Sequence, residues 1–105
     1  MAKKIACSPQ ETTDLKGSVE ETLGSLSKAV GHPARVKILQ ILIAKGECVS
    51  GDLAEEFALA QSTVSEHLRI LKEAGLVQGT IDGPRRCYCV NGGTLRLFKR
   101  LVADL

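Results

Sequence analysis

Aromatic side chains are scarce in this sequence. Its 105 residues include one tyrosine, two phenylalanines and no tryptophan. Hydrophobic residues still make up 44% of the chain and charged residues 25%, a balance typical of globular proteins and too apolar for a disordered one. Because a chain of this length builds one modest core and seldom two, the sequence predicts a single domain with an aliphatic interior.

Long apolar runs are also missing. No stretch approaches the roughly 20 apolar residues that span a bilayer, and the residues after Met1 lack the apolar segment of a signal peptide. We therefore expect a cytoplasmic protein with no membrane partner. In that reducing compartment, four cysteines argue against a disulfide scaffold and leave metal binding, redox sensing or plain burial.

Signatures of enzymatic chemistry are absent too. The cysteines have no Cys-x-x-Cys spacing and no matched general base, and the chain contains no glycine-rich phosphate loop. The sequence therefore predicts that the protein is not an enzyme. A thiol- or metal-handling protein without DNA binding remains the alternative from another functional class.

Positive charge is concentrated in the second half of the chain. Residues 61–105 carry seven basic and four acidic side chains, whereas residues 1–60 carry seven basic and eight acidic ones. A nucleic-acid surface is therefore expected in the second half.

The spacing of apolar residues predicts helices separated by glycine and proline signals. The helices are expected over residues 14–30, 33–45, 51–57, 61–74 and 94–105. The helix after Pro33 is apolar nearly all round, which predicts that it is buried. Two strands over 77–81 and 86–90 flank the turn Asp82-Gly83-Pro84-Arg85 and form a hairpin.

This order predicts a mainly α fold with a small β-hairpin wing. Two short helices joined by a tight turn and followed by a hairpin with a basic tip are the build of a winged helix-turn-helix. We expect one such DNA-binding domain over residues 1–105, with residues 1–13 as a loose N-terminal arm.

Three stretches of the chain resemble the arsenic-repressor (ArsR/SmtB) family of bacterial winged-helix regulators. They are LSKAVGHPARVKIL at 26–39, ALAQSTVSEHLRILKEAGLV at 58–77 and DGPRRCYCVN at 82–91. The resemblance implies a homodimer, formed through the first and last helices, that binds double-stranded operator DNA. It further implies release from the operator when a metal ion, a metalloid or another inducer binds.

The helix from residue 61 carries the residues suited to reading DNA. Its early polar positions, with Val64 and Leu68 facing inward, can lie against base edges in a major groove; they are Gln61, Ser62, Thr63 and Ser65. The Gln61 amide can form two bonds to adenine. A solvated polar face is the plainer interpretation of an isolated helix of this kind.

Basic residues are expected to contact the DNA backbone. On the same helix these are His67, Arg69 and Lys72. Arg85 and Arg86 flank the turn of the wing, where guanidinium groups can enter a minor groove or clamp a backbone. The family resemblance adds Arg35 as a phosphate contact. Because Ala60 occupies the slot where family members usually cap this helix with serine, we expect Ser62 to cap it instead.

The two sensor sites best known in the family are not carried over. Where arsenic repressors carry Cys-Val-Cys-Asp-Leu-Cys, residues 49–54 read Val-Ser-Gly-Asp-Leu-Ala. The zinc-sensing branch uses aspartate and histidine pairs on the last helix, and residues 94–105 contain no histidine. An inducer site must therefore come from the other cysteines.

Alternation along a strand places Cys87 and Cys89 on one face. Tyr88 and Val90 look like the core side, so we expect both thiols to face solvent. Cys48 is expected beside them, if the short segment before the helix-turn-helix pairs with the second wing strand.

Three such thiolates suit As(III), Sb(III) or a thiophilic divalent metal. Cys7, on the N-terminal arm, is a further candidate ligand, and the neighbouring arginines would lower the thiol pKa values. The sequence thus predicts a metalloid- or metal-responsive repressor, released by As(III) or an organoarsenical, that needs no cofactor on DNA. Plain burial of each cysteine stays open. So does a redox or sulfide sensor in which Cys48 and one wing cysteine form a reversible disulfide or polysulfide.

Overall fold

A computed structural model describes residues 17–46, 49–50, 59–82 and 85–105 of the chain. Its elements in this part of the chain are α1 Val19–Val30, α2 Pro33–Lys45, β1 Val49–Ser50, α4 Gln61–Glu73, β2 Val77–Asp82, β3 Arg85–Val90 and α5 Gly92–Ala103. The mainly α fold with a hairpin is confirmed. The arm predicted over 1–13 and the helix predicted over 51–57 lie outside the described residues.

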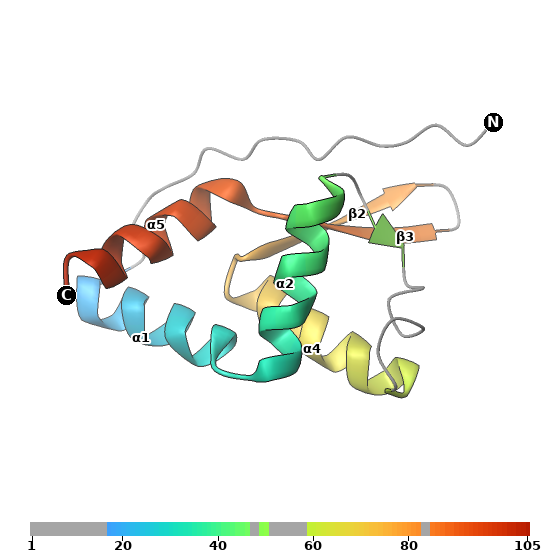
Figure 1. Cartoon of the computed structure of the whole chain (residues 1–105), viewed down its shortest axis with the longest axis horizontal. Helices are drawn as coiled ribbons and strands as arrows, with labels where there is room; N and C mark the ends of the chain where they lie inside the picture. The colour runs from blue at the N-terminus through green and yellow to red at the C-terminus, as the bar shows by residue number, and fades with distance from the viewer. Residues whose placement is uncertain (1–16, 47–48, 51–58, 83–84) are drawn as a thin grey trace.

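The first and last helices lie at one end of the molecule and the hairpin lies at the other (Figure 1). α1 and α5 pack against each other, α2 contacts β3, and α4 contacts both α2 and β2. The part of the chain that the structure covers includes no helix both long and apolar enough to cross a bilayer.

The strands form one antiparallel sheet in the order β1-β3-β2. β1 pairs with β3 through Val49 and Tyr88, which confirms that the short segment pairs with the second wing strand. The hairpin strands run one residue further than predicted at the turn, because Asp82 pairs with Arg85. β3 is therefore the central strand, with a neighbour on each side.

The core is built from aliphatic side chains, as the scarcity of aromatics predicts. Its buried residues are Leu26, Ala29, Ile38, Leu39, Leu42, Val64, Leu68, Leu71, Leu76 and Val77. Tyr88 and Phe98 are partly buried against this cluster. Because α1, α2, α4 and β2 all contribute to it, the core fixes α4 relative to the other helices and the wing.

Capping side chains set where the first two helices begin. The Ser18 hydroxyl accepts a hydrogen bond from the Glu21 N–H at 3.0 Å, so α1 starts at Val19. The start at residue 14 predicted from periodicity is therefore wrong. Pro33 begins α2 as predicted, and Nδ1 of His32 caps that helix by accepting from the Ala34 N–H at 3.1 Å.

Two glycines should respond oppositely to alanine. Gly75, just after α4, has φ +84°, where a β-carbon is strained. Gly75→Ala should therefore lower the free energy of unfolding by about 1–2 kcal/mol. Gly24 lies within α1, and a β-carbon added there would meet no atom within 4 Å, so Gly24→Ala should raise it by about 0.5–1 kcal/mol. Urea unfolding of both variants checks the two signs, and a stabilising Gly75→Ala would contradict the strain argument.

Candidate functional site

The N-terminal half of α4 presents a polar face to solvent. Gln61, Ser62, Thr63 and Ser65 are all exposed, whereas Val64 and Leu68 are buried. This confirms the division of the helix into a polar outer face and an apolar inner face. The exposed face carries an amide and three hydroxyls, which are the groups expected to reach base edges.

The beginning of α4 differs from the prediction. Ala60 is its N-cap, and the Ala60 carbonyl accepts hydrogen bonds from the N–H groups of Thr63 and Val64 at 3.0 and 3.1 Å. The expectation that Ser62 caps the helix is therefore wrong, because Ser62 already lies in its first turn. No side chain caps this end of α4, so the Ser62 hydroxyl stays on the exposed polar face.

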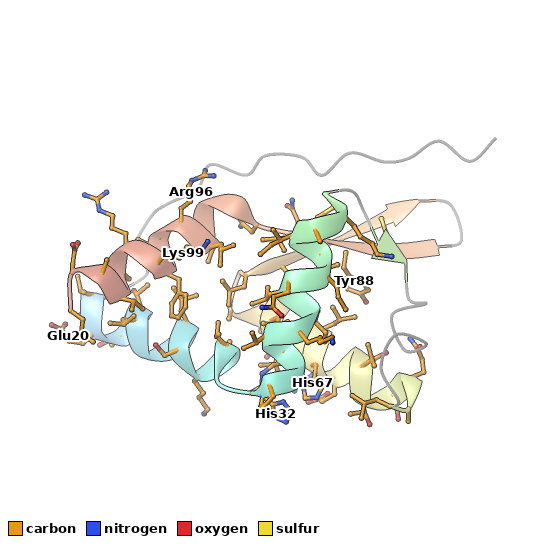
Figure 2. The ribbon with its side chains drawn as sticks, in the orientation of Figure 1. Glu20, His32, His67, Tyr88, Arg96 and Lys99 are labelled. Carbon is orange, nitrogen blue, oxygen red and sulfur yellow. The ribbon has the colours of Figure 1, made fainter. Side chains whose placement is uncertain are left out.

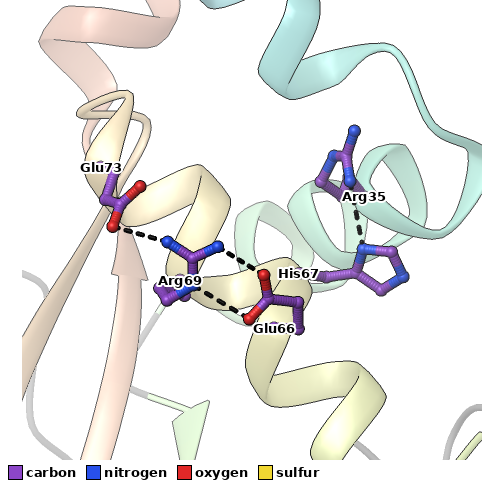
Figure 3. Close-up of polar contacts among 5 residues, drawn as sticks. All are labelled: Arg35, Glu66, His67, Arg69 and Glu73. Carbon is purple, nitrogen blue, oxygen red and sulfur yellow. Dashed lines mark hydrogen bonds and ion pairs between the residues drawn. The ribbon is translucent and has the colours of Figure 1, made fainter.

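Arg69 is engaged by two carboxylates on its own helix (Figure 3). Its Nη1 lies 2.7 Å from Glu73 Oε1 and its Nε donates to Glu66 Oε2 at 2.9 Å, while Nη2 also donates to Glu66. These contacts raise the pKa of Arg69, with the Glu66 hydrogen bond as the main cause, and they lower the pKa of Glu66. A phosphate would have to compete with both carboxylates for this guanidinium.

His67 and Arg35 contact each other on the inner side of α4. His67 is only 9% exposed, because it shares the inner face of α4 with Val64 and Leu68. Arg35 is half-buried, and its Nη1 lies 3.3 Å from Nδ1 of His67 (Figure 3). His67 therefore points toward the interior of the fold, and the Arg35 guanidinium is held beside it. Their contacts with phosphate stay predictions.

Lys72 lies against the wing. A β-carbon on Gly79 of β2 would be 3.3 Å from Lys72 Nζ and 3.7 Å from Cε1 of Tyr88. The Lys72 side chain therefore occupies space that the missing side chain of Gly79 leaves free. It lies between α4 and the hairpin and is exposed, and its contact with a backbone phosphate stays a prediction.

Arg85 and Arg86 are the first two residues of β3. Their backbones pair with Asp82 and Ile81, which places both at the turn end of the wing, as predicted. Their side chains lie outside the described part of the structure, as do residues 83 and 84.

The wing cysteines follow the predicted alternation but are not exposed. Tyr88 and Val90 pack against the core, which confirms their assignment. Cys87 and Cys89 are 5% and 2% exposed, so the prediction that their thiols face solvent is wrong. They lie on the central strand of the sheet, where neighbouring strands cover both edges.

Both wing cysteines are disulfide-bonded in the structure. The other two cysteines of the chain, Cys7 and Cys48, lie outside the described residues. Within residues 17–46, 49–50, 59–82 and 85–105, no group of three histidine, cysteine or acidic side chains is arranged to hold a metal. The predicted three-thiolate set therefore depends on residues that the structure does not describe.

Figure 2 shows one cluster that sequence reasoning missed, where His32 and His67 meet at the junction of α2 and α4. The centroids of the two imidazole rings are 4.6 Å apart, with the ring planes inclined at 47°. The sequence contains a signal for the burial of His67. This residue follows Val64 by three positions and precedes Leu71 by four, which is the spacing of the buried stripe of α4.

Comparisons with known proteins agree with this architecture. The model for "Bacterial regulatory protein, arsR family" matches residues 32–78. The transcriptional repressor SdpR of Bacillus subtilis is 34% identical over 74 residues, which cover 70% of this chain and 81% of SdpR.

Two solved structures resemble the fold. The crystal structure of a possible transcriptional regulator for arsenical resistance is similar with a TM-score of 0.68 and 31% identity, covering 76% of this chain and 81% of that one. The solution structure of the homodimeric winged helix-turn-helix domain Mb0332 of Mycobacterium bovis has a TM-score of 0.67 and 28% identity, covering 86% and 91%. This chain belongs to the arsR family of bacterial regulatory proteins and is a transcriptional regulator with a winged helix-turn-helix fold.

Proposed function

We propose that this regulator is a repressor that binds operator DNA as a homodimer and is released when its cysteine thiolates bind As(III) or an organoarsenical. The observation that carries the proposal is the position of Cys87 and Cys89. They follow Arg85 and Arg86 on the same strand, so a change at the sulfurs acts on the strand that holds the basic wing. No cofactor is needed by the DNA-bound form.

The DNA-binding part of the proposal is supported by α4 and the hairpin together. The exposed polar face of α4 has the shape and chemistry for a major groove, and β2 packs directly against α4. Because the wing is fixed to the recognition helix, both can contact one duplex at the same time.

The dimer is supported by an apolar surface at the opposite end. α1 and α5 pack against each other and leave Val19 and Val102 exposed, and Leu105, just after α5, is exposed as well. Burial of such side chains against a second copy is favourable, and the similar Mb0332 domain is homodimeric. A two-fold dimer through α1 and α5 would leave both wings free for the two halves of an operator.

The inducer is proposed from the sulfur chemistry. A disulfide-bonded sulfur has another cysteine sulfur at bonding distance, so reduction leaves thiols next to each other. Neighbouring thiolates bind soft trivalent ions such as As(III) and Sb(III), or a thiophilic divalent metal. The likeness to a possible regulator for arsenical resistance agrees with this choice.

A second candidate is thiol oxidation as the signal. The disulfide-bonded state of Cys87 and Cys89 favours it, because the fold accommodates the oxidised sulfurs. In this case two thiols give up two protons and two electrons to hydrogen peroxide, which is reduced to two water molecules. The metalloid and the oxidant then act on the same sulfurs.

Operator release distinguishes these signals. Operator DNA selected by the reduced wild-type protein from random duplexes is labelled and titrated with arsenite, phenylarsenite, cadmium, peroxide and, as a control, magnesium. We expect arsenite to release the wild-type protein, and Cys87→Ser and Cys89→Ser to bind the operator normally but to resist release. Cys7→Ser and Cys48→Ser identify any third ligand. An unchanged arsenite response in both wing variants would reject the thiol site.

Mass spectrometry of the same samples separates the two candidates. Release by peroxide with formation of a disulfide, and no release by arsenite, would favour the redox sensor. A protein that shows no preference for any duplex would contradict the DNA-binding proposal itself.

A further inference from the structure

A polar cluster joins the recognition helix α4 to the ends of α1 and α2. His67 extends from the inner face of α4, Arg35 comes from the first turn of α2, and His32 caps α2 (Figures 2 and 3). The ring centroids of His32 and His67 are 4.6 Å apart and Nη1 of Arg35 lies 3.3 Å from Nδ1 of His67, so the three side chains meet on the inner side of α4. The cluster is therefore placed to set the position of the DNA-reading face.

Arg35 belongs to α2, and its guanidinium contacts both α1 and α4. Its Nε donates to the Ala29 carbonyl at 2.5 Å and its Nη2 donates to the Lys28 carbonyl at 3.4 Å. Both carbonyls belong to the last turn of α1, which has no partners for them within the helix and carries partial negative charge. With Nη1 at His67, one side chain links the helix of the proposed dimer interface to the helix that reads DNA.

The contact between Arg35 and His67 requires a neutral imidazole. A guanidinium can only donate hydrogen bonds, so Nδ1 of His67 must accept the bond with its lone pair and the ring proton must lie on Nε2. Adding a proton to Nδ1 would place an N–H opposite another N–H and a second positive charge beside Arg35. The contact then becomes repulsive.

We propose that Arg35 and His67 are positioning residues for DNA recognition, in which neutral His67 holds α4 against the end of α1 and a proton on Nδ1 breaks this link and weakens operator binding. The inference rests on the proposed function for its DNA readout. It also predicts a change in stability that requires no DNA.

The charges around His67 favour its neutral form. Burial is the main cause that lowers its pKa, and the electrostatic interactions with His32 and Arg35 on the α2 side lower it further. Glu66, on its own helix, acts in the opposite direction. Because the folded-state pKa lies below the unfolded value of about 6.5, the unfolded chain binds the proton first as pH falls. Stability from neutral His67 is fully present above about pH 6.5 and is lost as pH decreases below it.

Two measurements over pH 5.5–8.0 test the hydrogen bond between Arg35 and His67. Thermal unfolding followed by circular dichroism gives stability, and fluorescence anisotropy with the selected operator gives affinity. For the reduced wild-type protein, we expect the unfolding midpoint and the operator affinity both to fall below about pH 6.5. His67→Asn keeps an acceptor for Arg35 but cannot bind the proton, so it should bind the operator at pH 7.5 and lose this pH dependence.

Two further variants complete the design. The chain contains two histidines, and His32→Asn removes the other one while keeping a good capping residue. It should retain the pH dependence. Arg35→Ala should weaken operator binding at every pH, because α1 and α4 lose their shared partner. A flat wild-type profile, or an unchanged acid response in His67→Asn, would overturn the proposal. Acid-sensitive stability without selective DNA binding would instead contradict the proposed function, while still supporting the pH-dependent contact between Arg35 and His67.

Discussion

Leu42→Ala should lower the free energy of unfolding by about 2–5 kcal/mol. Leu42 is 1% exposed on the inner face of α2 and belongs to the aliphatic core. Truncation to alanine removes its apolar contacts and leaves a cavity that the neighbouring helices can fill only in part. A domain of this size has a total stability of about 5–15 kcal/mol, so this loss is a large share of it and the variant should unfold at a clearly lower urea concentration.

The next residue provides a matched control. Ile43 has the same number of carbon atoms and lies in the same helix, but it is 50% exposed. Ile43→Ala should change stability by less than about 1 kcal/mol, because surface positions tolerate truncation and alanine favours a helix. Urea denaturation of both variants measures the difference. Equal losses at the two positions would mean that α2 does not bury the face that the structure assigns to it.

Gln61→Ala should reduce operator affinity by a large factor without affecting folding. A bidentate contact between an amide and a base contributes about 1–3 kcal/mol, and the proposed homodimer makes the contact twice, so the expected loss is roughly 2–6 kcal/mol. Gln61 is exposed in the first turn of α4, where alanine is well tolerated. Anisotropy titrations with the selected operator and with a scrambled duplex measure the effect.

Gln40→Ala is the control for Gln61→Ala. Gln40 is an exposed glutamine on α2, so the same chemical change is made away from the recognition helix. It should leave operator affinity unchanged. Because Gln61 is neutral, its loss should not change the salt dependence of binding or the affinity for the scrambled duplex. Equal weakening on both duplexes would assign Gln61 to the backbone and not to a base.

His67 shows the limit of a residue-type argument. Its type and its helix suggested a phosphate contact, but its phase on the helix coincides with the buried stripe of Val64, Leu68 and Leu71. The position of His67 around the helix axis points its side chain toward the core. Arg35 supplies the hydrogen-bond partner that makes burial of this polar ring favourable. That partner is 32 residues away in the sequence, so no local pattern could reveal it.

The wing cysteines show the same limit for a strand. Alternation correctly separated Cys87 and Cys89 from Tyr88, because the side-chain period of a strand is a local property. It could not tell whether the second face was covered. Burial of that face depends on what packs over a central strand, which the strand's own residues do not encode.

The sequence by itself determined the helices from Pro33 and Gln61, the hairpin, the aliphatic core and the polar face of α4. Each of these follows from spacing, turn residues and composition along a short segment of chain. Only the tertiary structure decided that His67 points inward to meet Arg35, and that both wing sulfurs are enclosed. The physical reason is that burial and pairing of a side chain depend on atoms that the fold brings from distant parts of the chain.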